Sequence, residues 1–109
     1  MKLPHGDRAI VDIRKLQEYC LNPQHARGRN KAPVFASAGV RYDDAPELRD
    51  ALEAAAREGE AQPGPDSLYG SRFTIDFDFS ARDRTIKVRS AWIARRDEDC
   101  PRLTSCYVL

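Results

Sequence analysis

The feature that most constrains the fold is a change in the spacing of apolar residues near position 72. Before it, apolar side chains recur every three or four residues, as on one side of a helix. After it, the stretch RFTIDFDF alternates apolar and polar residues with a period of two, which is typical of a strand with one covered and one wet face. Helices followed by strands predict an α+β fold, with N-terminal helices packed on one face of an antiparallel sheet of three or four strands.

Helices are expected within residues 12–59. The first begins after Asp12, a residue suited to the N-cap, and ends before Pro23, because a proline drives the preceding residue out of the helical region. A short second helix begins at a cap on Asn30 and runs through residue 38. Gly39 then supplies its C-terminal stop.

A third helix is expected over residues 44–59. Asp44 and Glu47 are spaced as in a capping box, and a proline between them suits the first turn. Gly59 ends this helix. The prolines and glycines of residues 60–71 then predict a loop.

Residues 72–109 are expected to form an antiparallel meander, with turns at SARDR and DEDCP. The segment RAIVDI near the start could add a short edge strand. Residues 1–109 would then form a single domain. Alternation divides the side chains of the first two strands between a covered face (Phe73, Ile75, Phe77, Phe79, Ile86, Val88 and Trp92) and an open face (Thr74, Asp76, Asp78, Lys87 and Arg89).

Composition narrows the class of protein. Hydrophobic residues make up 41% and charged residues 32% of the 109 positions, a globular balance. No apolar run approaches the ~20 residues of a membrane span, and the first residues contain no signal-peptide core. We therefore expect a cytoplasmic protein with no membrane partner. Three cysteines without CxxC spacing, Cys20, Cys100 and Cys106, are expected to be small apolar fillers.

Charge is unevenly distributed along the chain. Residues 1–33 carry seven Lys or Arg against three Asp or Glu, residues 34–70 carry three against eight, and residues 71–109 carry eight against six. The net charge of +1 is therefore the sum of a basic N-terminal segment (the head, residues 1–33), an acidic middle segment and a mildly basic C-terminal segment (the tail, residues 71–109). If the head and the tail share one face, that face could bind a polyanion. An ordinary solvated surface remains the alternative.

Neither a cofactor nor a metal is expected, because nucleotide-binding loops and zinc motifs are lacking. Asp76 and Asp78 face the same way on a strand, but two carboxylates without a third ligand make a weak cation site. They fit a solvated strand face better. Trp92 is expected in the core, with a base-stacking surface as the less favoured interpretation.

The segment QHARGRNK concentrates groups suited to metal-free RNA cleavage. That reaction needs a base for the 2′-hydroxyl proton, an acid for the leaving 5′-oxygen, and cations for the phosphorane charge. His25 suits either proton role. Arg27, Arg29 and Lys31 suit the charge role. A lone histidine in a basic connector is the plainer interpretation of the same residues.

The order and spacing of these residues also resemble a small bacterial domain family of uncharacterised function. Its pattern runs K-L-x-x-Y-x-L-x-x-x-H-x-x-G-x-x-K-A-x-x-F, then R-[ST]-x-W, then P-R-L-x-[ST]-x-Y. In this chain the matching positions are Lys15, Leu16, Tyr19, Leu21, His25, Gly28, Lys31, Ala32, Phe35, Arg89, Ser90, Trp92, Pro101, Arg102, Leu103, Ser105 and Tyr107.

Such domains look like toxin modules of the broad fold group that contains barnase, RelE-like toxins and other metal-free ribonucleases. The resemblance implies an endoribonuclease whose site lies on the open sheet face, acting on RNA and restrained by a cognate antitoxin or immunity protein. It implies a catalytic set of His25, Lys31, Arg89, Ser105 and Tyr107, with Arg27, Arg29, Arg102 and Thr104 binding the substrate.

The sequence leaves two questions unanswered: which face of the last strand is open, and which function the domain has. Strict alternation places Leu103, Ser105 and Tyr107 on one face of the last strand and Thr104 and Cys106 on the other, and it does not say which face is open. Thr104 and Ser105 are therefore rivals for one role. The function also has rivals: a non-enzymatic module that binds protein or nucleic acid through the open sheet face, or a regulatory partner using the acidic helix at 44–59.

Overall fold

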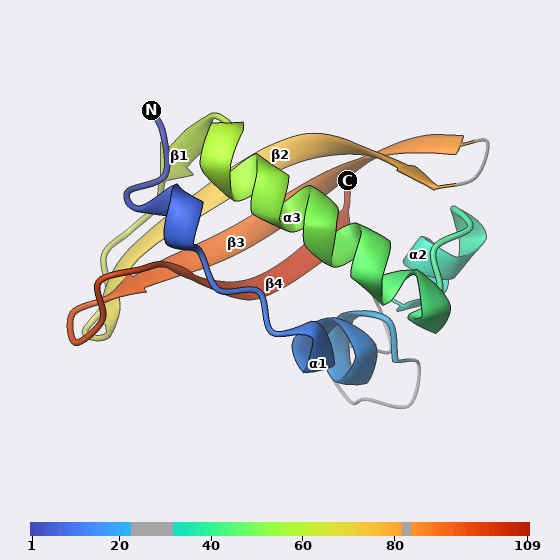
Figure 1. Ribbon diagram of the computed structural model, residues 1–109, viewed down its shortest axis with the longest axis horizontal. Helices are drawn as coiled ribbons and strands as arrows, with labels where there is room; N and C mark the ends of the chain where they lie inside the picture. The colour runs from blue at the N-terminus through green and yellow to red at the C-terminus, as the bar shows by residue number, and fades with distance from the viewer. Residues whose placement is uncertain (23–31, 82–83) are drawn as a thin grey trace.

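The computed structural model describes residues 1–22, 32–81 and 84–109, with helices first and strands afterwards (Figure 1). The strands form one antiparallel sheet in the order β1-β2-β3-β4. The expected α+β fold is confirmed. The strands are β1 (Ala61–Pro63), β2 (Gly70–Ala81), β3 (Arg84–Arg95) and β4 (Arg102–Val108).

The first helix begins where the sequence predicts. The Asp12 side chain accepts a hydrogen bond from the Arg14 backbone N–H at 3.0 Å, which satisfies one of the free donors of a helix N-terminus. The last turn is π-helical, because the Leu21 N–H donates to the Leu16 carbonyl five residues back, at 2.8 Å. The helical elements are η1 (Gly6–Arg8), α1 (Ile13–Lys15), η2 (Leu16–Cys20), α2 (Ala32–Ser37), η4 (Tyr42–Asp44) and α3 (Ala45–Glu58).

The ends of α2 and α3 confirm some expectations and correct one. Gly39, at φ 86°, follows α2 as a left-handed stop, while the expected cap at Asn30 lies outside the described residues. The capping box expected for α3 is wrong: Asp44 Oδ2 accepts from the Arg41 N–H at 2.8 Å and so caps η4 instead. Gly59 ends α3 as expected.

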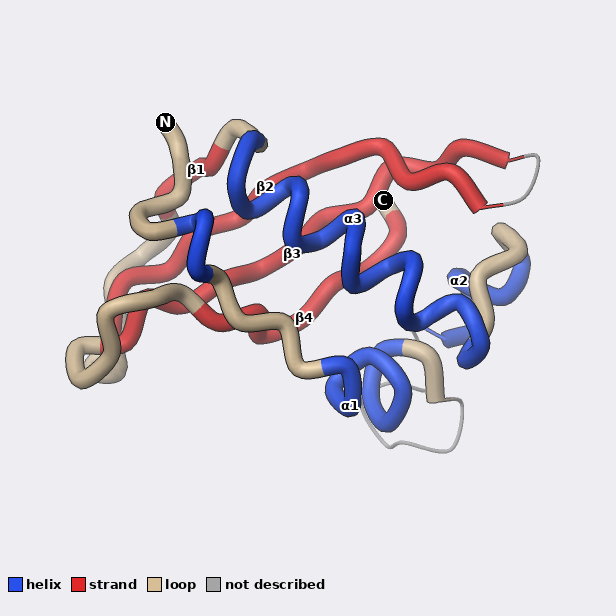
Figure 2. Tube along the Cα trace, in the orientation of Figure 1, coloured by secondary structure: helices blue, strands red, loops and turns tan. Residues whose placement is uncertain are grey.

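All the helices lie on one face of the sheet (Figures 1 and 2). α3 packs on β2, while η2 and α2 contact β4. Alternation in β2 and β3 directs apolar side chains toward these helices, as predicted. No helix of the described residues covers the opposite sheet face. The largest buried core side chains include Trp92, Phe35, Leu16, Leu48, Leu52, Ile75, Val40 and Val88.

The structure also bears on the expectations for the cysteines, for Trp92 and for membrane-spanning helices. Cys20 and Cys106 are buried and Cys100 is half-buried, in keeping with the filler role. Trp92 is 1% exposed, so the base-stacking alternative for its ring is wrong. Among the described helices, none is both long and apolar enough to cross a bilayer.

The loop expected over residues 60–71 is partly wrong. Residues 61–63 form β1, which pairs with β2 in the register Ala61↔Ile75 and Pro63↔Phe73. Proline is tolerated there because β1 is an edge strand. The edge strand suggested by RAIVDI is reduced to a single parallel bridge, Ile10↔Arg102, beside β4.

Strict alternation is also wrong for β4. Ala91 pairs with Ser105, but Trp92 pairs with Leu103, so Thr104 is an extra residue in a β-bulge. The bulge shifts the alternation by one position. Leu103 and Cys106, three residues apart, are consequently both buried in the core.

Candidate functional site

The uncovered sheet face carries a transverse row of polar side chains across β2, β3 and β4. Asp76 is paired in register with Arg89, and Arg89 is paired with Tyr107. Residues that pair across antiparallel strands share a face, so the three side chains lie together. We call Asp76, Arg89 and Tyr107 the central row.

Arg89 is held by its neighbours in the central row. Its Nε lies 2.7 Å from Asp76 Oδ1 and its Nη2 lies 2.9 Å from Asp76 Oδ2, a bidentate ion pair. The Asp76 hydrogen bond, and secondly that of Tyr107, raise the pKa of Arg89 above its already high ordinary value. The pair also lowers the pKa of Asp76. All three side chains remain partly open to solvent, with Tyr107 at 37% exposure.

The next pair along the same face is also neutralised. Lys87 Nζ lies 2.8 Å from Asp78 Oδ1, and this hydrogen bond raises the pKa of Lys87. Asp76 and Asp78 thus each face a cationic side chain rather than each other. Within the described part of the chain, no group of three potential metal ligands occurs.

The β-bulge decides how the two rival hydroxyls of β4 lie. Ser105 pairs with Ala91 and therefore shares the open face with Tyr107. Thr104 also reaches this side, where it lines a hollow with Arg72 and Ile93. Its Oγ1 donates to the Ala91 carbonyl at 3.1 Å. Ser105 Oγ is buried and has no hydrogen-bond partner among the described residues.

Arg102 is held away from the central row. It pairs in register with Ile93, four positions along β3 from Arg89. Its Nε lies 2.8 and 2.9 Å from the two carboxylate oxygens of Glu98. The pairing lowers the pKa of Glu98 and raises that of Arg102. The Arg102 guanidinium is therefore paired with the Glu98 carboxylate.

The structure therefore brings together three of the expected catalytic residues on one face: Arg89, Ser105 and Tyr107. Thr104 lies on the same face and Arg102 at its end. The other expected residues lie outside the described part of the chain: His25, Arg27, Arg29 and Lys31.

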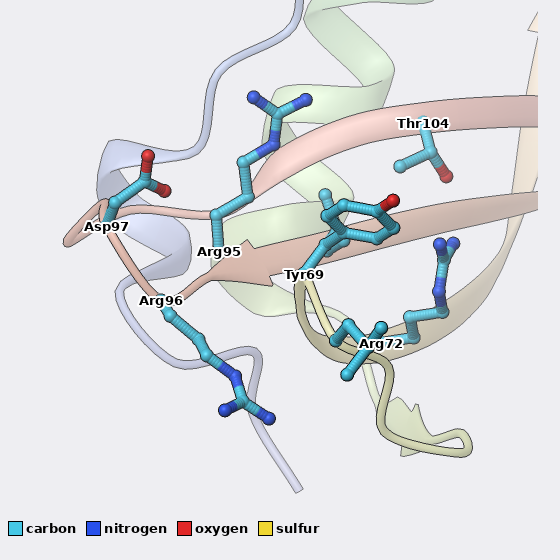
Figure 3. A pocket seen from close by; sticks show the side chains of 8 residues that line it. Tyr69, Arg72, Arg95, Arg96, Asp97 and Thr104 are labelled. Carbon is cyan, nitrogen blue, oxygen red and sulfur yellow. The ribbon is translucent and has the colours of Figure 1, made fainter.

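Sequence reasoning missed the role of Asp76 as the partner of Arg89. Alternation within each strand showed that both residues face outward, but it did not give the register between strands. An open hollow of about 590 Å³, which lies on this face near the end of β3, was also not predicted from the sequence (Figure 3). Arg72 lies at this end, at the alternating spacing that continues from Thr74 and Asp76. That spacing was the available signal.

Comparison with protein families adds one result. A family model described as a domain of unknown function, DUF6883, matches residues 2–109. The chain belongs to this family. Neither the curated proteins nor the solved structures gave a match. Membership of DUF6883 covers nearly the whole chain, as the sequence resemblance did, and it assigns no activity.

Proposed function

We propose that this domain is a toxin-like, metal-independent endoribonuclease of a bacterial toxin–antitoxin or toxin–immunity pair. It would act on RNA in the cytoplasm under the control of a cognate antitoxin or immunity protein. The observation that carries the proposal is the central row: an arginine set between a carboxylate and a phenol on a sheet face that no described helix covers.

The row suits the chemistry of RNA self-cleavage. The 2′-oxygen attacks the adjacent phosphorus, its proton passes to a base, the bond to the 5′-oxygen breaks, and an acid protonates that oxygen. The products are a 2′,3′-cyclic phosphate and a 5′-hydroxyl. Since the RNA supplies the nucleophile, the protein needs only proton carriers and a cation for the phosphorane charge.

Each member of the row has a distinct part in the proposal. Arg89 stabilises the phosphorane, because its planar fork matches phosphate oxygens. Tyr107, two-fifths exposed beside it, orients the phosphate or shares the proton transfer. Asp76 is a positioning residue: its carboxylate holds the Arg89 guanidinium, and this pairing lowers the pKa of Asp76.

The remaining roles come from the sequence. His25 is the general acid or base and Lys31 adds positive charge at the phosphorane. Ser105 would position the scissile phosphate, although its buried Oγ must first become accessible. Flanking phosphates would be bound by Arg27, Arg29, Arg102 and Thr104.

The test is cleavage of RNA by the purified domain, with growth of bacteria after induction as a second readout. His25→Ala and Arg89→Ala should each lower the cleavage rate by ~100-fold or more. Arg57→Ala, an exposed arginine on α3, is the control and should cleave like the parent. Equal cleavage by His25→Ala and the parent would remove the proposed acid–base residue, and parental cleavage by Arg89→Ala would remove the site.

A non-enzymatic binding module is the second candidate, and the Asp76–Arg89 pair favours it. A guanidinium that already engages both oxygens of a carboxylate has fewer donors to offer a phosphate. Such a module would bind a protein or nucleic acid through the same face without cleaving it. Normal growth and intact cellular RNA after induction, together with retained binding by the purified domain, would favour this candidate.

A further inference from the structure

The hollow at the far end of the open face combines an aromatic ring with positive charge. It has a volume of about 590 Å³. Figure 3 shows the Tyr69 ring and the Arg72 side chain on the side where Thr104 lies, while Arg95 and Arg96 extend from the end of β3. Leu68 and Ile93 complete its apolar lining.

Two exposed side chains that line this hollow, Leu68 and Tyr69, belong to a turn that several hydrogen bonds hold in place. Leu68 is 87% and Tyr69 71% exposed. The backbones of Ser67 and Gly70 bond to each other at 3.0 and 3.3 Å, and Ser67 Oγ accepts from the Tyr69 N–H at 3.2 Å. Arg96 adds a bond from its N–H to the Tyr69 carbonyl at 3.3 Å. The turn therefore presents two neighbouring apolar side chains to solvent.

Gly70 lets this turn lie against β3. Its φ is +151°, and a Cβ on it would lie 2.1 Å from the Ala94 carbonyl oxygen. Any side chain would push the turn away from the sheet. Gly70 thus keeps the turn that carries Tyr69 beside the end of β3.

Positive charge exceeds negative charge around the hollow. The Arg72 side chain makes no hydrogen bond or ion pair with any described residue, whereas the Arg89 side chain is paired with Asp76. Arg95 Nε lies 3.8 Å from Glu98 Oε1, a long contact, and Arg96 Nη2 donates to the Ser67 carbonyl at 3.3 Å. Asp97 is the one acid among the described lining residues. The surplus favours an anionic ligand.

The hollow and the central row lie at different positions along the open face of the sheet. Arg72 and Asp76 are four residues apart on the same side of β2, which corresponds to about 13 Å along a strand. A single RNA strand lying on the sheet could therefore reach both places within a few nucleotides.

We infer that the hollow is a subsite for a nucleotide that flanks the reactive phosphate of single-stranded RNA. The base would stack on Tyr69 and Leu68, and Arg72 would bind the adjoining phosphate, with Arg95 and Arg96 adding positive charge. The inference rests on the proposed function, for which it specifies the substrate. Unpaired bases offer a ring face for stacking, whereas duplex RNA does not.

Binding can be separated from cleavage with a fluorescently labelled, 2′-O-methylated single strand, which lacks the 2′-hydroxyl nucleophile. Fluorescence anisotropy then reports affinity alone. Tyr69→Ala should weaken binding roughly tenfold, since stacking on an aromatic side chain is lost. Tyr69→Phe, which keeps the ring, should bind like the parent. Tyr42→Ala, at an exposed tyrosine in η4, is the matched control and should have no effect.

Salt dependence tests the charge. Arg72→Ala should lower the slope of log affinity against log salt by about 0.7, the value for one phosphate contact on a single strand. Arg57→Ala on α3 should leave the slope unchanged.

The outcomes distinguish this inference from the proposed nuclease activity. Binding that depends on Tyr69 and Arg72, without cleavage of ordinary RNA, supports the hollow as a binding site for single-stranded RNA and overturns the nuclease activity. Cleavage and binding that are both unaffected by Tyr69→Ala and Arg72→Ala overturn the subsite alone. Equal affinity for oligoglutamate and for RNA also overturns it, in favour of an acidic protein partner.

Discussion

Ser90 and Arg89 are neighbours in β3, yet their side chains lie on opposite faces of the sheet and meet different kinds of partner. Under the helices, Ser90 Oγ donates to the Ile75 carbonyl and accepts from Trp92 Nε1, both at 2.8 Å. On the open face, Arg89 pairs with the half-exposed Asp76. A buried polar group that loses its partner stays desolvated, whereas an exposed one returns to water.

This difference separates structural from functional polar groups in one sheet. The covered groups have no alternative partner, so their bonds hold the core in one arrangement. The open-face groups can exchange an internal partner for water or a ligand at little cost. We therefore expect substitutions on the covered face to act on stability and those on the open face to act on binding or catalysis.

Trp92→Ala should have the largest effect, because it removes the largest fully buried side chain among the described residues. It should lower the free energy of unfolding by about 3–5 kcal/mol, measured by chemical denaturation. Tyr107→Ala, an aromatic truncation on the open face, is the control and should cost under about 1 kcal/mol. Equal losses in the two variants would contradict the contrast between the faces.

The same substitution at two serines sharpens the comparison. Ser90→Ala leaves the buried Trp92 Nε1 without its acceptor and should cost about 1–3 kcal/mol. Ser105→Ala removes a buried hydroxyl that has no described partner, and should leave the free energy of unfolding unchanged or raise it by up to about 1 kcal/mol. Denaturant melts of both variants test this. A loss at Ser105 equal to that at Ser90 would show that Ser105 Oγ has a partner in the folded chain.

The smallest effect concerns the pH dependence of Asp76. Arg89 lowers the pKa of this carboxyl in the folded state, so the pair stabilises the fold above the ordinary pKa of about 4 and loses that contribution as pH falls through the lower folded value. Because the pair is exposed, the gain is at most about 1 kcal/mol.

Asp76→Asn should accordingly be slightly less stable than the parent at pH 7, and the two should converge in acid. Melting temperatures between pH 7 and pH 2 measure this. Asp66→Asn, at an exposed aspartate for which no described residue provides an ion pair, should track the parent throughout. A gap between Asp76→Asn and the parent that persists in acid would show that the ion pair is not its cause.

Much of the candidate site could be predicted, and its limits have a physical cause. Alternation placed Asp76 and Arg89 on the open face, because a side chain's face depends only on its own strand. Their pairing depends on the register between strands, which local spacing does not contain. The hollow was missed for a similar reason: it joins a turn before β2, the end of β3 and the bulge of β4.

The sequence by itself determined the class of fold and most of the covered face. Period-two alternation in β2 and β3, caps such as Asp12 and a stop such as Gly39 act over a few residues, so they can be recognised locally. Tertiary packing decided the rest. It recruited residues 61–63 as an edge strand, and it inserted Thr104 as a bulge so that Leu103 and Cys106 could both reach the core. Burial of apolar area outweighs a local break in the ladder, and only the assembled core shows where that exchange is favourable.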